Sequence, residues 1–217
     1  MVLGIYGAGG LGREVLELAR IINERNHRWD DFAFVDDGAS DDIVNGAAVY
    51  AYEEALEKFS GNLEMAMGVG EPSTRERLFA KLERDGIVTP ALIHPDVHIP
   101  ETTAVGKGAI IQGGCFISCN VKIEDYVLIQ PLAGVGHDDK LCVGAVISSM
   151  SALAGNVSVS RYTYIGLSVA IKEGVSIGDH SIVGMHSAVH RDVESDVVAI
   201  GNPARPMKRN EERRVFK

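Results

Sequence analysis

The residues best suited to chemistry are a histidine and two carboxylates in the run Gly134-Val135-Gly136-His137-Asp138-Asp139-Lys140. A histidine titrates near neutral pH and can act as a general base. A neighbouring carboxylate can orient its ring and stabilise the imidazolium that forms. An exposed polar loop could have the same composition, so the spacing alone leaves both interpretations open.

A second group of candidates is the glycine-rich run Gly7-Ala8-Gly9-Gly10-Leu11-Gly12, which matches the pattern G-x-G-x-x-G. It follows a short apolar strand and precedes an amphipathic helix that is expected to begin near Arg13. Backbone N–H groups at such a helix start suit a phosphate or pyrophosphate. Asp36 and Asp37 end the next predicted strand, residues 32–35, where carboxylates can accept hydrogen bonds from a ribose or a base. A structural glycine turn with a strand-capping aspartate is the alternative interpretation.

The other histidines offer weaker chemistry. His180, His186 and His190 lie near the end of the chain without carboxylates at a matched spacing. A metal site would need His137 and two of these to meet across a subunit interface. This arrangement is disfavoured, and we expect no metal.

These candidates must be positioned by larger elements, of which the clearest is a six-residue repeat. Every sixth residue from Val105 to Val189 is aliphatic, whereas a helix requires apolar residues at spacings of three and four and a strand requires alternation. Such a period is typical of hexapeptide β-helix repeats, in which stacked coils bury what one hexad cannot. A β-sandwich with regular strands is the disfavoured alternative. Asp139 occupies a position that is small or Val in other hexads, so we expect this coil to deviate locally or to make room for it.

Residues 1–90 are expected to form a small α/β unit with a Rossmann-like parallel sheet, with ligands at the carboxyl ends of its strands. A helix is predicted over residues 73–85, with Ser73 as its N-cap and Glu76 completing a capping box. Further elements are predicted at residues 52–58 (helix), 64–69 (strand) and 87–88 (strand). Residues 91–217 are expected to form the β-helix and a C-terminal tail. The first unit is too short for a complete dinucleotide-binding domain with a substrate domain, which counts against an NAD-linked reductase.

Composition restricts the function classes further. The net charge of −9 argues against broad nucleic-acid binding. No apolar run has membrane-spanning length and no signal peptide is recognised, so we expect a cytoplasmic protein without a membrane partner. The three cysteines lie inside the repeat and are expected to be reduced packing residues.

Several motifs together resemble a known family. They are Ile5-Tyr6-Gly7-Ala8-Gly9-Gly10, Asp36-Asp37, Gly68-Val69-Gly70 with Arg75, His137-Asp138, Ala154-Gly155-Asn156-Val157 and Gly201-Asn202-Pro203-Ala204-Arg205. The sequence resembles the bacterial nucleotide-sugar acetyltransferases of the left-handed β-helix superfamily over almost the whole chain. Both the sialic-acid O-acetyltransferases and the enzymes that N-acetylate UDP-4-amino-sugars belong to this group.

The resemblance implies a homotrimer with active sites at the subunit interfaces of a left-handed parallel β-helix. It implies acetyl-CoA in the groove between adjacent prisms, and a nucleotide-sugar whose uridine part is held by the N-terminal unit. His137 would be the general base, Asp138 would polarise it, and the amide of Gly155 would hold the thioester carbonyl.

The resemblance also implies binding residues. The nucleotide would contact Gly7, Gly9, Gly10, Gly12, Asp36 and Asp37. The sugar or phosphate would contact Gly70, Arg75 and Gln130, the last at a position where relatives commonly have Asn. CoA would contact Gly155, Met185, Gly201, Pro203 and Arg205.

We therefore predict an acetyl-CoA-dependent acetyltransferase that acts on the amino group of a UDP-linked 4-amino-sugar for a bacterial surface polysaccharide. Direct transfer is favoured over an acetyl-enzyme, because no Cys or Ser stands beside His137 in a nucleophile arrangement. O-acetylation of a sugar or sialic acid stays open, since a hydroxyl acceptor would use the same base. A nucleotide-binding assembly protein with a degenerate prism is the alternative of a different class.

Overall fold

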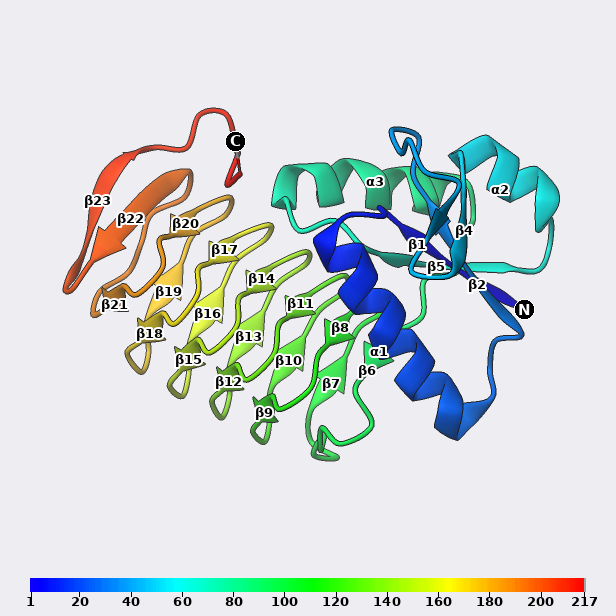
Figure 1. The fold of residues 1–217 in the computed structure, drawn as a ribbon. Coiled ribbons are helices and arrows are strands. Elements are labelled where there is room, and N and C mark those ends of the chain that lie inside the picture. Colours follow the sequence, from blue (N-terminus) through cyan, green and yellow to red (C-terminus); the bar gives the residue numbers. More distant parts are fainter. Residues whose placement is uncertain (217) are drawn as a thin grey trace.

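The computed structural model describes residues 1–216 and contains an α/β unit followed by a three-sided prism of stacked short strands (Figure 1). The α/β unit lies at one end of the prism, and the last strands lie at the other. A Rossmann-like parallel sheet followed by a left-handed parallel β-helix is the fold predicted from the sequence, and that prediction is confirmed. The boundary at residue 90 stays a prediction.

The α/β unit is built on a five-stranded sheet in the order β3-β4-β2-β1-β5. Its strands are β1 (Val2–Tyr6), β2 (Asp31–Val35), β3 (Ile43–Val44), β4 (Ala47–Tyr50) and β5 (Leu63–Met67). All neighbours are parallel except β3 and β4, which form an antiparallel pair. Every residue of the central strand β1 is buried, as expected for a parallel strand covered on both faces.

Three helices cover this sheet: α1 (Gly10–Asn26), α2 (Tyr52–Lys58) and α3 (Pro72–Arg84). Apolar side chains of α1 pack against Leu3, Ile5 and Phe34 of the sheet. The side chains of α2 and α3 pack against Met65 and Met67 in a separate cluster. The carboxyl ends of β1 and β2 are therefore left open beside the start of α1.

The structure corrects several predicted boundaries. Helix α3 begins at Pro72 and its N-cap is Glu71, which makes no side-chain capping bond. The predicted capping box of Ser73 and Glu76 is therefore wrong, because proline at the first helical position starts the helix earlier. Val88 forms only an isolated bridge with Glu64 instead of a strand.

The prism has three faces, which we call A, B and C. Face A contains β6 (Leu92–Ile93), β8 (Ile110–Ile111), β11 (Leu128–Ile129), β14 (Val146–Ile147), β17 (Tyr164–Ile165), β20 (Ile182–Val183), β22 (Val197–Gly201) and β23 (Ala204–Arg209). Face B contains β9 (Phe116–Ile117), β12 (Gly134–Val135), β15 (Ala152–Leu153), β18 (Ala170–Ile171) and β21 (Ala188–Val189). Face C contains β7 (Ala104–Val105), β10 (Lys122–Ile123), β13 (Lys140–Leu141), β16 (Ser158–Val159) and β19 (Ser176–Ile177).

Each coil of the prism takes 18 residues, so residues 18 apart lie above one another. The register pairs Ile123 with Leu141 and Leu128 with Val146. The second residue of each two-residue strand points inward, and all the aliphatic repeat positions are buried except Val105, which is partly buried. The six-residue period thus marks the interior of the prism.

Face A carries the N-terminal unit. Leu92, Ile110, Leu128 and Val146 point outward from this face at 18-residue intervals and are buried in one cluster with the apolar side of α1. Burial of this outward row fixes the N-terminal unit to the first coils. Faces B and C and the edge between them lie away from that contact.

The C-terminal residues close the prism and return toward the N-terminal unit. Strand β23 pairs antiparallel with β22 at the end of face A. The backbone N–H groups of Val215 and Phe216 donate to the carboxylate of Glu71 at 2.9–3.0 Å. Within residues 1–216, no helix combines the length and apolar character needed to cross a membrane.

Candidate active site

His137 lies in the turn that joins β12 to β13, on the edge between faces B and C. Its Nδ1 atom is 2.8 Å from Oδ2 of Asp138, and about half of the imidazole is exposed. An ionised carboxylate can only accept, so Nδ1 carries the proton and Nε2 keeps its lone pair. Nε2 is therefore the atom that can take a proton from an acceptor group.

Asp138 is held in place by the geometry of its coil and by the coil before it. Its backbone is left-handed (φ 61°), as are Asn120 (φ 58°) and Asn156 (φ 58°), 18 residues before and after it. Asn and Asp tolerate this conformation better than most residues. The Asn120 amide donates to Oδ1 of Asp138 at 3.1 Å, so Oδ2 is oriented toward the imidazole.

The two side chains shift each other's titration. The hydrogen bond to Asp138 raises the pKa of His137 above its ordinary value. The same bond, together with the Asn120 amide, lowers the pKa of the Asp138 carboxyl. A bonded carboxylate favours the charged imidazolium, which makes His137 a stronger base than a free histidine.

Gly155 lies on the next coil, directly against the His137 ring. A β-carbon at Gly155 would overlap Cε1 and Nε2 of the imidazole and would lie 2.8 Å from Nδ1. The backbone of Asn156 also donates to the carbonyl of His137 at 2.9 Å. The absence of a side chain at Gly155 leaves the room that the ring occupies.

Asp139 is buried inside the same edge, with 1% of its surface exposed. Its Oδ2 accepts the N–H of Gly136 at 2.8 Å, and its Oδ1 accepts the N–H of Val157 at 2.7 Å. Burial raises the pKa of this carboxyl to about 7, although both N–H bonds act in the opposite direction. The expectation that this coil deviates locally or makes room for Asp139 is confirmed, since the buried carboxylate takes the N–H of Gly136.

The glycines of the N-terminal turn divide into two kinds. Gly7 has φ 103°, and a β-carbon at Gly12 would overlap the Gly7 carbonyl, so these two residues allow the strand and helix to pack closely. Gly9 and Gly10, at the start of α1, have no atom within 4 Å of a built β-carbon. Gly9 and Gly10 are therefore the ones whose backbone a phosphate could approach.

Asp36 and the helix start line one open depression of about 270 Å³, together with Ala8, Arg13 and the loop 38–41. Oδ2 of Asp36 accepts the N–H of Ala8 at 2.9 Å. The structure thus brings Gly9, Asp36 and the cationic Arg13 together around one depression.

Asp37 faces a different depression, lined by Tyr6, Arg77, Leu78, Lys81 and Arg84 among others. Its Oδ1 also accepts the N–H of Tyr52 at the start of α2 at 2.8 Å. Although adjacent in sequence, Asp36 and Asp37 do not line one pocket.

Arg75 and Gly70 were both expected near the sugar or phosphate. Arg75 is fully buried and donates to the carbonyls of Val69 and Tyr126 at 2.9 and 2.7 Å. Its guanidinium joins the N-terminal unit to the prism and is not open to a ligand. A β-carbon at Gly70 would lie 3.6 Å from Leu11 and 3.7 Å from Phe216.

The residues expected to bind CoA lie on two edges. Gly155 shares the B–C edge with His137, whereas Met185 lies in the turn after β20, on the A–B edge, where Gln130 also lies. Met185 is 63% exposed. Gly201 and Pro203 form the β22–β23 connection at the end of face A, and Arg205 is exposed on β23.

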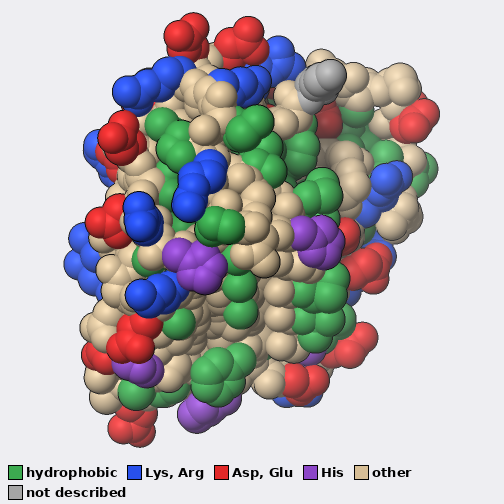
Figure 2. All heavy atoms as spheres, turned by 90° about the vertical axis from the view of Figure 1, so that its left-hand side faces the viewer, with side chains coloured by type: hydrophobic (Ala, Val, Ile, Leu, Met, Phe, Trp, Pro, Cys, Tyr) green, Lys and Arg blue, Asp and Glu red, His purple; other side chains and the backbone are tan. Residues whose placement is uncertain are grey.

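Figure 2 shows the C-terminal end of the prism, where Lys and Arg side chains gather around hydrophobic ones. The exposed basic residues of this segment include Arg205, Lys208 and Arg209. A single chain therefore does not bring Met185 and Arg205 onto the edge that holds His137.

The sequence analysis does not predict the contact of Asn120 with Asp138, nor the hydrogen bonds of Asp139. Asn120 lies one coil before Asp138 and donates a hydrogen bond to it, and the 18-residue coil length is the signal that would have found this contact. The double acceptor role of Asp139 has no signal in the sequence beyond its unusual place in the repeat. Among residues 1–216, no cluster of three or more His, Cys, Asp or Glu side chains has the geometry to hold a metal ion.

Comparison with known proteins shows that the chain is similar to sugar N-acetyltransferases. The PglD N-terminal domain family matches residues 2–82. The GDP-perosamine N-acetyltransferase of Escherichia coli O157:H7 is 29% identical over 216 residues, 95% of the chain and 96% of the relative.

Two solved structures match nearly the whole chain. PerB from Caulobacter crescentus, solved in complex with CoA and GDP-perosamine, is 30% identical over 96% of the chain and 98% of PerB, with a TM-score of 0.87. The acetyltransferase domain of PglB from Neisseria gonorrhoeae FA1090 is 25% identical over 95% of the chain and 99% of that domain, with a TM-score of 0.88.

Proposed function

The chain belongs to the nucleotide-sugar acetyltransferases of the hexapeptide-repeat family, and on that premise we propose that it acetylates a nucleotide-linked 4-amino-sugar with His137 as the general base. It is an acetyl-CoA-dependent sugar N-acetyltransferase, as its relatives are. The proposed role of His137 rests on its hydrogen bond to Asp138. This bond leaves Nε2 free on an exposed edge beside Gly155.

In the reaction, His137 first accepts a proton from the amine and later donates it to the thiolate of CoA. The neutral amine of the sugar attacks the thioester carbon, and Nε2 of His137 takes the proton that the nitrogen loses. The amide N–H of Gly155 donates to the oxyanion that forms. The C–S bond then breaks, and the imidazolium returns its proton to the thiolate, so that amide and free thiol leave and neutral His137 remains.

The nucleotide-sugar binds at the open start of α1, with its phosphates at the N–H groups of Gly9 and Gly10 and its ribose or base at Asp36. Arg13 supplies a positive charge in the same depression. Asp37 and Gly70 adjoin this region from other sides. Arg75 acts on the substrate only through the loop that its guanidinium holds at Val69.

We favour a uridine nucleotide because of the motifs that the chain shares with enzymes acting on UDP-4-amino-sugars. A guanosine nucleotide is the second candidate, since PerB was solved with GDP-perosamine and the Escherichia coli relative acts on that sugar. The two candidates share the acceptor chemistry and differ only in the base that the N-terminal unit must hold.

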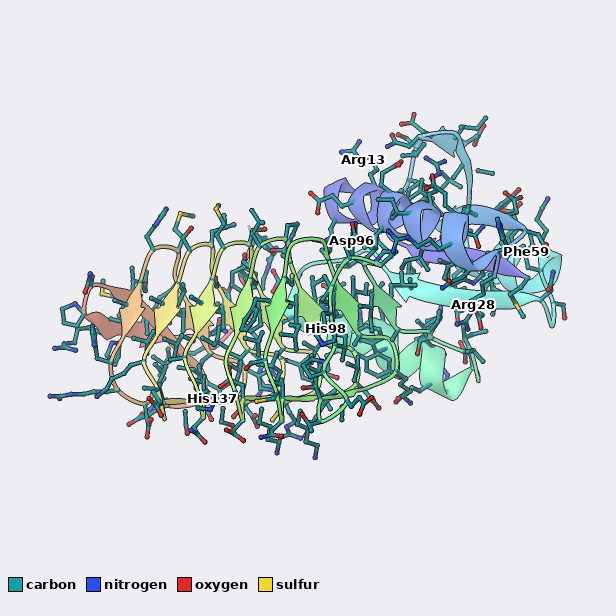
Figure 3. All side chains as sticks on the ribbon, turned by 90° about the horizontal axis from the view of Figure 1, so that it is seen from below. Arg13, Arg28, Phe59, Asp96, His98 and His137 are labelled. Carbon is teal, nitrogen blue, oxygen red and sulfur yellow. The ribbon has the colours of Figure 1, made fainter. Side chains whose placement is uncertain are left out.

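The active enzyme is a homotrimer in which neighbouring subunits complete each site. His137 and Arg13 lie on opposite sides of one chain (Figure 3), so a sugar held by the N-terminal unit of one subunit meets His137 of another. Leu132, Met150, Leu167 and Met185 expose apolar surface along the A–B edge, which suits contact between prisms. CoA lies in the groove between two prisms and contacts Gly155 on one and Met185, Gly201, Pro203 and Arg205 on the other.

The test measures CoA thiol release with UDP- and GDP-linked 4-amino-sugars, and with the matching 4-hydroxy sugars as controls. Wild type should turn over an amino-sugar, and His137→Ala should lose at least about 10²-fold in kcat. His27→Asn, a change at a remote histidine in a left-handed helix cap, should leave turnover unchanged. Full activity in His137→Ala would refute the proposed base.

A mixing experiment tests the shared site. Inactive His137→Ala and a nucleotide-site variant, Asp36→Ala, are denatured together and refolded as mixed oligomers. Recovery of part of the wild-type activity is expected if each site takes His137 and Asp36 from different subunits. No recovery of activity would contradict the shared site. A monomer by light scattering would contradict the trimer.

A further inference from the structure

Along the B–C edge, residues 18 positions apart lie above one another, and we call the row that contains Asp139 the inner-corner positions. Asp139 is the one charged residue in this row. The positions at 18-residue intervals are occupied by Thr103, Val121, Asp139, Val157, Val175 and Val193. A carboxylate at such a position costs desolvation energy that valine does not. Its presence at this coil and no other of the stack coincides with the turn that carries His137.

The carboxylate breaks the regular hydrogen-bond ladder at that turn. On face B, the residue after each strand normally donates its N–H to the next coil: Ser118 to the carbonyl of Val135, and Ala154 to that of Ile171, both at 3.1 Å. Gly136 occupies the same place, but its N–H donates to Asp139 instead. The β12–β15 pair accordingly keeps only the Gly134–Ala152 register and lacks that of Val135 with Leu153.

The chemistry of the side chain explains the break. Thr103, in the same stack, accepts the N–H of Val121 through its hydroxyl oxygen and donates its proton to the carbonyl of Ser118. A hydroxyl can therefore donate one hydrogen bond and accept another. An ionised carboxylate has no proton to donate, so Asp139 accepts the N–H of Val157 with one oxygen and the N–H of Gly136 with the other.

We propose that Asp139 is a positioning residue for acetyl transfer: it holds the Gly136–His137 turn out of the ladder and ties it to the coil that carries Gly155. This inference rests on the proposed role of His137 as the base. The two oxygens of Asp139 reach the two turns that must stay in register, through Gly136 on one and Val157 on the other. The bonds set where the imidazole lies against Gly155.

A graded set of variants isolates this role. Asp139→Val places the residue that most other coils of the stack contain, so the prism is expected to fold. Asp139→Asn keeps one acceptor oxygen and loses the second bond. Thr103→Val removes a polar inner-corner side chain two coils away from His137 and serves as the matched control.

The structural readout needs no substrate. In a crystal structure of Asp139→Val, the Gly136 N–H is expected to return to the carbonyl of Leu153, and the His137 ring is expected to move relative to Gly155. An unchanged turn in this variant would overturn the proposal. Because this result does not depend on turnover, it stands even if His137→Ala proves that the proposed function is wrong.

The kinetic readout separates positioning from folding. Asp139→Val is expected to lower kcat about 10²-fold, as a misplaced catalytic group does, with the KM for acetyl-CoA unchanged and with thermal stability no lower than that of wild type. Asp139→Asn should fall between wild type and Asp139→Val, and Thr103→Val should match wild type. Wild-type kcat in Asp139→Val, or an equal loss in Thr103→Val, would overturn the proposal.

Discussion

The imidazole of His137 lies against the α-carbon of Gly155, so closely that a β-carbon on Gly155 would overlap ring atoms Cε1 and Nε2. The two residues are 18 positions apart and belong to successive coils, so the stacking of the prism itself sets their separation. The backbone bond from Asn156 to the His137 carbonyl fixes the same pair of turns. The proposed base and the proposed oxyanion donor are thus placed by one structural relationship.

Gly155→Ala should therefore impair catalysis far more than folding. The new methyl group must push the ring aside, and a displacement of about 1 Å can cost 10²-fold in rate. We expect kcat to fall by about that factor in a thiol-release assay. Gly134→Ala is the matched control, because a β-carbon at Gly134 meets nothing within 4 Å, and it should keep wild-type kcat.

Asp138→Asn should shift the pH dependence of kcat/KM. His137 acts when deprotonated, so activity rises as pH increases through its pKa, which the bond to Asp138 raises. Removing the negative charge lowers that pKa and moves the acid limb to lower pH. The plateau rate should fall on the order of 10² to 10⁴-fold, because an amide no longer fixes the Nδ1–H tautomer.

The measurements are a pH–rate profile and an NMR titration of the His137 ring. Asn120→Ala loosens Asp138 without removing its charge and should change the plateau only a few-fold. An acid limb that stays at the same pH in Asp138→Asn would show that His137 is not the titrating base.

The six-residue period was sufficient to predict the prism, because aliphatic residues at that spacing have no other efficient way to be buried. Sequence could also place His137 and Asp138 together, since they are neighbours. The support from Asn120 was missed because it depends on the 18-residue coil length rather than on the hexad. The Asp139 bonds could not be predicted, because they depend on the Gly136 N–H donating to this side chain and not to the next coil.

Arg75 shows why residue type alone misleads. An arginine that follows a glycine loop in the sequence could bind a phosphate, or it could be a buried residue that links the N-terminal unit to the prism. The burial of Arg75 and its hydrogen bonds to two backbone carbonyls favour the second interpretation. Ser73 was misread for a similar reason, since Pro72 fixes the helix start. The start of the helix is thus decided by a local residue, whereas the burial of Arg75 comes from tertiary contacts.

Arg75→Met should destabilise the protein by about 2–5 kcal/mol, because it leaves the carbonyls of Val69 and Tyr126 without their donor and weakens the stacking on Phe79 at 5.2 Å. Arg77→Met, at an exposed position of the same helix, should cost less than about 0.5 kcal/mol. Thermal or denaturant unfolding measures both. A higher KM for the nucleotide-sugar at unchanged stability would instead restore the direct ligand contact expected from the sequence.

We expect the contribution of Asp139 to the free energy of unfolding to decrease as the pH rises. Its pKa in the folded protein is about 7, above the ordinary value of 3.8, so the folded state binds this proton more tightly than the unfolded chain does. Protonation of Asp139 therefore supports folding below about pH 4, and this contribution is lost as pH rises toward 7. Relative to wild type, Asp139→Val should gain stability across that window, on the order of 4 kcal/mol at most.

Denaturant unfolding of wild type, Asp139→Val and Thr103→Val between pH 4 and 8 measures the effect, because all other titrating groups are common to the three proteins. The difference between Asp139→Val and wild type should grow with pH and level off above about pH 8. Thr103→Val should differ from wild type by the same amount at every pH, since a hydroxyl does not titrate in this range. A flat difference for Asp139→Val would mean that the two N–H bonds from Gly136 and Val157 fully offset the burial of the carboxylate.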